Sequence, residues 1–132
     1  MVEATSNPLP RYVHAVPDTI LVVEDEVLVR LTIADQLRSA GFSVLEAANA
    51  DEALDLLRDK DNAVRLLLSD IRMPGTLDGV ELARVIRARH SEIKVVLTSA
   101  ESFSGHWFDH DGFFPKPYDA TRLIEHIKML LR

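Results

Sequence analysis

The chain has 132 residues, 47% of them hydrophobic and 27% charged, which is typical of one globular domain with one core. It carries 15 basic and 21 acidic residues, and the formal net charge of −6 disfavours direct binding to nucleic acid. There is no cysteine, which excludes disulfides and thiolate chemistry. The sequence shows no membrane-spanning stretch and no signal peptide, so we expect a cytoplasmic protein without a membrane partner.

The chain alternates short apolar runs with amphipathic stretches. Pro8, Pro10 and Pro17, set among small and polar residues, predict a flexible N-terminal arm over residues 1–17. Apolar runs then predict strands at Thr19–Val23, Phe42–Ala47, Val64–Ser69, Lys94–Ser99 and, briefly, Gly112–Phe114. Val27, Leu31, Ala34 and Leu37 stand at helical spacing and predict a helix over residues 27–40. Apolar residues at helical spacing also predict helices after the cap-like residues Asn49, Asp78 and Asp119.

This order predicts an α/β domain over residues 18–132, built on a parallel sheet with helices on both faces. Residues 100–111 show little helical periodicity, so we expect the helix between the last two strands to be short, distorted or absent. In such sheets a ligand lies beyond the carboxyl ends of the strands. The residues at those ends are therefore the candidate site.

Charged and hydroxyl side chains collect at those strand ends. Glu24-Asp25-Glu26 follow the first strand, Asp70 follows the third, Ser99 ends the fourth, and Lys116 comes after the fifth. An all-oxygen ligand set suits a hard cation, and Mg²⁺ is favoured because it binds a few carboxylates and bridges to phosphate. Lys116 offers a point charge to a phosphoryl oxygen, Ser99 a hydrogen bond, and Asp70 a carboxylate able to form an acyl phosphate. The plainer interpretation is a set of solvated strand-end carboxylates with Lys116 as a surface partner.

Five motifs, in order, resemble a response-regulator receiver domain: Val22-Val23-Glu24-Asp25-Glu26, Ser69-Asp70-Ile71-Arg72-Met73-Pro74, Asp78-Gly79, Thr98-Ser99-Ala100 and Lys116-Pro117-Tyr118. The resemblance implies a flavodoxin-like (βα)5 fold, a doubly wound parallel sheet in strand order 2-1-3-4-5. It implies that Asp70 accepts a phosphoryl group and that Mg²⁺, with Mn²⁺ as an alternative, is held by Glu24, Asp25, Asp70 and the Arg72 carbonyl. It also implies that Ser99, Lys116 and Phe113 bind or sense the phosphoryl group, and that the Lys116–Pro117 bond is cis.

The sequence departs from the usual pattern of that family at four places. The acidic pair is Glu24-Asp25 rather than Asp-Asp, and the Met73–Gly79 loop is one residue longer than usual. Phe113 lacks the hydroxyl of the commoner tyrosine, and the stretch from Ser99 to Lys116 is several residues shorter than usual. These departures bear on the switch and on any contact made by the fourth helix.

The resemblance implies a single-domain, phosphorylation-dependent protein-interaction switch rather than a metabolic enzyme. Its phosphoryl donor would be a histidine kinase or a histidine phosphotransfer protein, with onward relay and a phosphorylation-independent binding module as alternatives. A phosphatase of the haloacid-dehalogenase type is disfavoured, because that class needs an aspartate where Arg72 stands. Two weaker signals lie in the unusual segment: a ligand-like His106-x-x-x-His110 spacing, and aromatic residues for packing or a partner patch, namely Phe103, Trp107 and Phe108.

Overall fold

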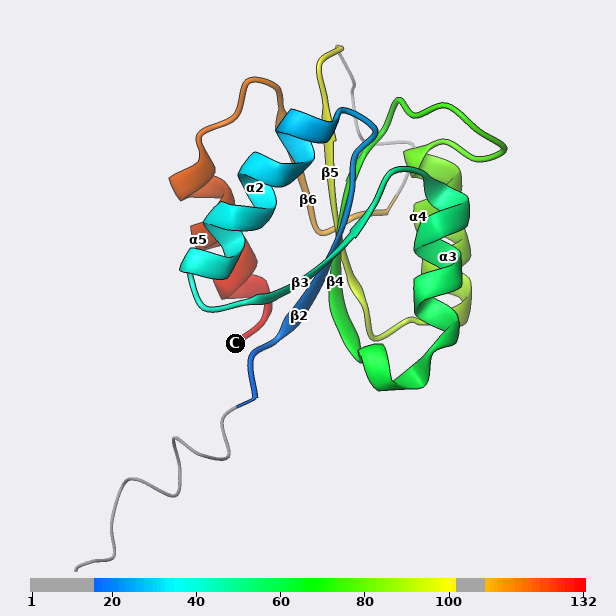
Figure 1. Ribbon diagram of the computed structural model, residues 1–132, viewed down its shortest axis with the longest axis horizontal. Helices are drawn as coiled ribbons and strands as arrows, with labels where there is room; N and C mark the ends of the chain where they lie inside the picture. Colours follow the sequence, from blue (N-terminus) through cyan, green and yellow to red (C-terminus); the bar gives the residue numbers. More distant parts are fainter. Residues whose placement is uncertain (1–15, 102–108) are drawn as a thin grey trace, which may run out of the picture.

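The computed structural model describes residues 16–101 and 109–132 (Figure 1). The strands are β2 (Thr19–Val23), β3 (Ser43–Ala47), β4 (Val64–Asp70), β5 (Lys94–Ser99) and β6 (Gly112–Pro115). The helices are α2 (Val27–Ser39), α3 (Ala50–Arg58), α4 (Gly79–Arg89) and α5 (Ala120–Leu130), with a 3-10 turn, η1, at Lys60–Asn62. All strand pairs are parallel and the sheet order is β3-β2-β4-β5-β6, which confirms the predicted order 2-1-3-4-5.

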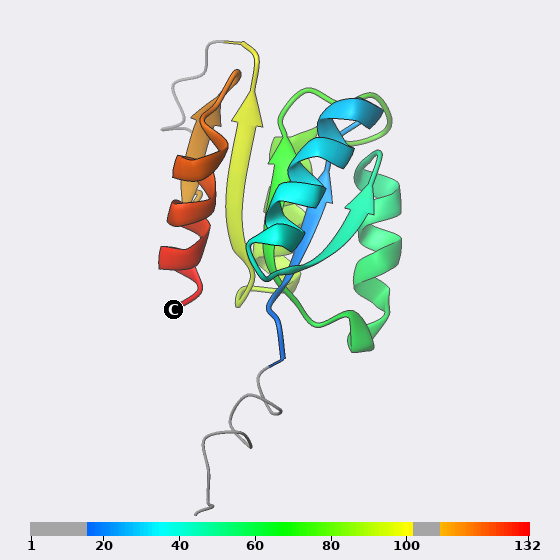
Figure 2. The ribbon, with the colours of Figure 1, turned by 60° about the vertical axis from the view of Figure 1, so that its left-hand side comes forward.

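The helices cover both faces of the sheet, α2 and α5 on one and α3 and α4 on the other (Figures 1 and 2). Residues of β2 alternate between the two layers: Ile20 and Val22 join one apolar cluster, and Leu21 and Val23 join the other. Each of the four is at most 1% exposed, and burial of such a side chain contributes about 1.5–3 kcal/mol. This double-sided burial explains why the strand reads as a continuous apolar run.

Side-chain caps begin three of the helices where the sequence predicts them. Asn49 accepts the Glu52 N–H at the start of α3, and Asp119 accepts two N–H groups at the start of α5. At α4, Asp78 and Glu81 form a reciprocal capping box. The predicted α2 is also confirmed, but two members of its apolar pattern, Val27 and Leu31, are exposed, because the core-facing residues of that helix are Ile33, Ala34 and Leu37.

Gly79 lets α4 begin directly against the end of β4. Its N–H donates to the Ile71 carbonyl at 2.8 Å. A Cβ at this position would overlap the carbonyl oxygen of Asp70 and would lie 2.8 Å from the Ile71 Cα. The absence of a side chain at residue 79 therefore determines how closely α4 packs on the strand that carries Asp70.

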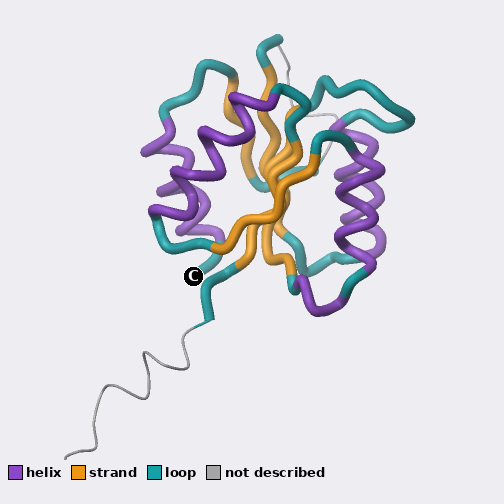
Figure 3. The backbone as a smooth tube through the Cα atoms, viewed as in Figure 1, coloured by secondary structure: helices purple, strands orange, loops and turns teal. Residues whose placement is uncertain are grey.

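Asp111 fixes the start of β6 against β5, two of the strands drawn in orange in Figure 3. Its N–H donates to the Val95 carbonyl at 2.7 Å, and its Oδ2 accepts the Val95 N–H at 2.8 Å and Arg87 Nη2 at 3.1 Å. The predicted irregular fourth helix falls mainly on residues 102–108, outside the described residues, as do His106 and the three aromatic residues named above. Most of the predicted N-terminal arm, residues 1–15, also lies outside them. In the two described ranges no helix is long and apolar enough to cross a membrane.

Candidate functional site

Four strands deliver the predicted site residues to one edge of the sheet. Glu24 directly follows β2, Asp70 ends β4, Ser99 ends β5 and Lys116 directly follows β6. The Lys116 N–H donates to the Ser99 carbonyl at 2.8 Å, which continues the β5–β6 pairing by one step and places the lysine beside the other strand ends. The chain reverses its winding direction between β2 and β4, and this is where α/β sheets bind ligands.

Three carboxylates converge at this edge. Glu24, Asp25 and Asp70 each present an oxygen within 4.8 Å of the others. Glu24 is 4% exposed and Asp70 is 8% exposed, while Asp25 is the least buried of the three. A compact set of carboxylate oxygens fits a hard divalent cation such as Mg²⁺, which would supply positive charge next to a phosphoryl group.

Lys116 links two of the carboxylates. Its Nζ lies 2.6 Å from Glu24 Oε1 and 3.2 Å from Asp70 Oδ2. The lysine side chain is 16% exposed and is therefore mostly withdrawn from water. Its ammonium group gives partial charge compensation to a cluster that would otherwise be wholly negative.

The charges of the site leave a surplus of buried negative charge. Burial raises the pKa of Glu24 and of Asp70, and the hydrogen bonds and charge of Lys116 oppose this without cancelling it. Burial by itself lowers the pKa of Lys116, but its hydrogen bond to Glu24 and the charge of Asp70 outweigh burial, so that the pKa is raised. A cation bound by the acidic cluster would reduce this surplus.

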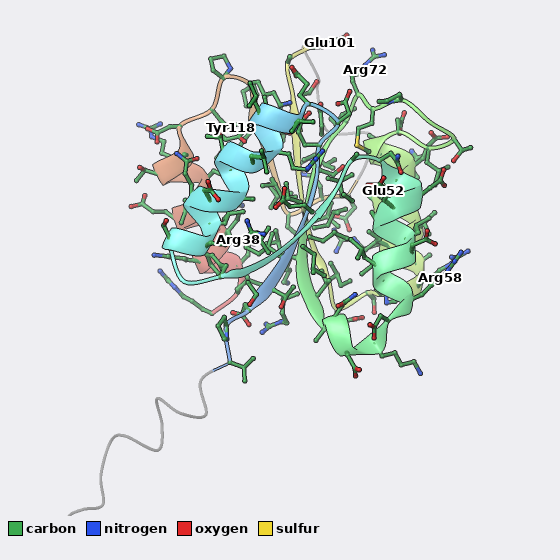
Figure 4. All side chains as sticks on the ribbon, viewed as in Figure 1. Arg38, Glu52, Arg58, Arg72, Glu101 and Tyr118 are labelled. Carbon is green, nitrogen blue, oxygen red and sulfur yellow. The ribbon has the colours of Figure 1, made fainter. Side chains whose placement is uncertain are left out.

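Backbone and side-chain groups of the neighbouring loops complete the rim. Ser99 is 2% exposed, and its Oγ accepts the Glu101 N–H at 3.1 Å. The Arg72 N–H approaches Asp70 Oδ1 at 3.4 Å, and Arg72 Nη2 pairs with Glu101 Oε1 at 3.2 Å. Figure 4 shows Arg72 and Glu101 on the loops at this end of the sheet. The ion pair joins two exposed side chains and contributes little stability by itself.

The structure brings Glu24, Asp25, Asp70 and Lys116 together. The Lys116–Pro117 peptide bond is cis. Ligation by the Arg72 carbonyl and switching by Phe113 remain predictions; Phe113 is half-buried on β6 and packs on the α3/α4 side of the sheet.

Arg30 is not among the site residues predicted from the sequence, yet its Nη1 donates to the Glu24 carbonyl oxygen at 2.8 Å. The sequence does place Arg30 about one turn into the helix that follows Glu24 and Asp25, and this position could have indicated a contact with the acidic pair.

An apolar groove adjoins the site on the α2 side. A cavity of about 390 Å³ lies between α2 and the start of α5 and includes Leu28 and Tyr118. A second of about 400 Å³ shares Tyr118 and reaches Lys116. Leu28 is 79% exposed, and Val27 and Leu31 are also exposed, so this edge of α2 presents apolar surface to solvent. The position of Tyr118 beside α2 is visible in Figure 4.

Comparison with known proteins identifies the family. Residues 20–128 match the model for the response regulator receiver domain. The chain is similar to the response regulator MprA of Mycolicibacterium vanbaalenii (37% identity over 122 residues; 88% of this chain, 51% of that protein). It is also similar to the sensor kinase CckA of Brucella abortus (36% over 118 residues; 86% of this chain, 12% of that protein). The chain thus spans about half or less of these curated relatives.

Solved structures agree with this assignment. The crystal structure of the receiver domain from the hybrid histidine kinase CckA matches with a TM-score of 0.74 and 37% identity, covering 86% of this chain and 99% of that one. The response regulator TrrA of Thermotoga maritima, crystallised in complex with Mg²⁺ and BeF, matches with a TM-score of 0.76 and 32% identity, covering 86% and 98%. The chain therefore belongs to the response regulator receiver domain family of two-component signalling.

Proposed function

We propose that this domain, residues 18–132, accepts one phosphoryl group on Asp70 and that this modification changes its affinity for a protein partner. The observation that carries the proposal is the bridge from Lys116 to Glu24 and Asp70 beside three converging carboxylates. In the proposed step a carboxylate oxygen of Asp70 bonds to phosphorus as the bond from phosphorus to the donor imidazole nitrogen breaks, and the imidazole leaves with the bonding electrons.

Each neighbouring group has a proposed part in that step. Glu24 and Asp25, together with Asp70 and the Arg72 carbonyl, would hold Mg²⁺, with Mn²⁺ as a substitute, and the bound cation would offset charge on the phosphoryl oxygens. Lys116 exchanges its contact with Asp70 for a phosphoryl oxygen, and the Ser99 hydroxyl donates to another. The Phe113 side chain then changes its packing on the α3/α4 side of the sheet.

We further propose that a histidine kinase or histidine phosphotransfer protein delivers the phosphoryl group by covering the apolar edge of α2. A donor histidine must reach Asp70, so the protein that carries it must cover surface beside the site. The groove between α2 and Tyr118 reaches Lys116, and the exposed Leu28 lies on its rim. An apolar helix face on the donor protein fits this groove.

Intact mass after incubation with a small acyl phosphate donor tests the central proposal. One phosphoryl addition is expected for the wild type with Mg²⁺, and none for Asp70→Asn or without Mg²⁺. Addition to Asp70→Asn would place the acceptor elsewhere. If neither an acyl phosphate, a kinase nor beryllofluoride modifies or binds the wild type, a phosphorylation-independent binding module becomes the better interpretation.

The docking proposal has a separate test. Leu28→Asp should slow transfer from a phosphorylated partner protein at least tenfold and leave the reaction with the small donor unchanged. Met129→Asp is the matched control, because it places the same charge at an exposed apolar position of α5. The neighbouring Leu130 packs on the core and does not serve this purpose. Equal slowing by Leu28→Asp and Met129→Asp would refute docking on α2.

A further inference from the structure

We propose that Arg30 is a positioning residue of the cation site. Its guanidinium fixes the peptide group between Glu24 and Asp25 and thereby sets the direction in which the Asp25 carboxylate leaves the backbone. The inference rests on the proposed Mg²⁺ site and adds to it a residue that touches neither the cation nor the phosphoryl group.

Arg30 makes two directed contacts from α2. Its Nη1 donates to the Glu24 carbonyl oxygen at 2.8 Å, and its Nε lies 3.3 Å from Glu46 Oε1 on β3. The Arg30 side chain is only 16% exposed, so water competes weakly for these donors. A planar guanidinium can hold both acceptors in a fixed relation, which the single ammonium of lysine cannot do.

Glu46 is itself held in place. Its Oε2 pairs with Arg38 Nη2 at 3.1 Å, and the same Arg38 nitrogen donates to the Val44 carbonyl at 3.2 Å. Glu46 stands opposite Val22 in the β2–β3 ladder. The guanidinium of Arg30 is therefore braced on a strand that is paired with the strand leading into the acidic cluster.

Each polar group of Glu24 has a hydrogen-bond or ion-pair partner. Its N–H donates to the Ala47 carbonyl at 3.0 Å, and its carboxylate binds Lys116 and accepts the Glu26 N–H at 3.1 Å. The Glu24 carbonyl, which Arg30 binds, belongs to the same rigid plane as the Asp25 N and Cα atoms. Rotation of that plane would change the direction of the Asp25 side chain, the least buried of the three candidate ligands, relative to the other two.

Arg38 provides a matched control for Arg30. Both arginines pair with Glu46 from α2, but among the described contacts it is Arg30 that reaches the Glu24 carbonyl. Substitution of either residue removes one ion pair to Glu46. A difference in Mg²⁺ binding between the two variants thus isolates the contact with the backbone of the acidic pair.

The test is isothermal titration of Mg²⁺ into the wild type, Arg30→Met, Arg30→Lys and Arg38→Met, with urea denaturation of each in chelator. Loss of a group that orients metal ligands weakens metal binding by about 10–100-fold. We expect the Kd to rise about tenfold in Arg30→Met, to rise less in Arg30→Lys, and to stay within twofold of wild type in Arg38→Met. If Arg30→Met folds and binds Mg²⁺ as tightly as Arg38→Met does, the inference about Arg30 is overturned while the proposed cation site stands. If Arg30→Met does not fold, the same comparison is made with Arg30→Lys. A wild type without saturable Mg²⁺ binding would overturn the proposed cation site and the inference with it.

Discussion

Gly79 offers the most direct test of the way the fold holds Asp70. Substitution by alanine adds one methyl group at the first residue of α4, where it would overlap the Asp70 carbonyl oxygen and lie 2.8 Å from the Ile71 Cα. Non-bonded carbon atoms prefer separations of about 3.5–4.0 Å. Either α4 or the end of β4 must therefore move by about 1 Å.

Both stability and reactivity should respond to that movement. Overpacking of a close contact costs about 1–3 kcal/mol, which lowers Tm by roughly 4–12 °C in a domain of this size. Displacement of a reacting group by about 1 Å can slow a reaction about 100-fold. We expect Gly79→Ala to lose stability within this range and to be phosphorylated by a small donor at least tenfold more slowly.

Gly41→Ala is the matched control. Gly41 has φ +102°, and a Cβ there meets nothing within 4 Å, so alanine adds backbone strain far from the site. Thermal denaturation and the rate of mass change would be measured for both variants. The expected result is that both lose stability and that Gly79→Ala alone loses reactivity. Normal phosphorylation of a destabilised Gly79→Ala protein would refute the idea that this contact positions Asp70.

Three further substitutions test the charges of the candidate site and the contacts of Asp111 at the start of β6. Asp70→Asn should raise the free energy of unfolding by more than about 0.5 kcal/mol at neutral pH without Mg²⁺, because burial outweighs Lys116 and raises the Asp70 pKa; a loss in urea denaturation would contradict this. Lys116→Met leaves Glu24 and Asp70 without the ammonium group that they share and should cost about 3–5 kcal/mol near pH 7.5. Burial raises both carboxyl pKa values and Lys116 opposes this, so loss of Lys116 raises both pKa values further. Protonation then favours the folded variant more than the folded wild type, so this cost should shrink as the pH falls toward 5; a cost independent of pH would contradict the pairing. Asp111→Ala should cost about 2 kcal/mol by leaving the Val95 N–H without its side-chain acceptor, while the Kd for Mg²⁺, measured by titration, should stay unchanged.

The fold could be predicted because its signals are local. Buried strands read as apolar runs, and the capping residues Asn49, Asp78 and Asp119 stand at the helix starts. The convergence of Glu24, Asp25, Asp70 and Lys116 also followed, since the carboxyl ends of parallel strands share one edge. The strand order itself came from the family resemblance.

What the sequence could not predict depends on register and on side-chain reach. The contacts of Arg30 with the Glu24 carbonyl and Glu46 require the β2–β3 register and the helix orientation together. The exposure of Val27 and Leu31 shows the same limit, because helical spacing alone does not indicate which apolar residues face the sheet. The contacts of Asp111 with Arg87 and Val95 join the start of β6 to α4 and β5, and no short-range sequence pattern predicts them.

The two ends of β6 also have a consequence for protein engineering. Asp111 fixes the strand at its beginning, and the hydrogen bond from Lys116 to Ser99 fixes it at its end. The lysine thus receives its position from hydrogen bonds at both ends of β6. An engineered domain that keeps Asp111 and the hydrogen bond from Lys116 to Ser99 should therefore keep this lysine in place when other positions of β6 are changed.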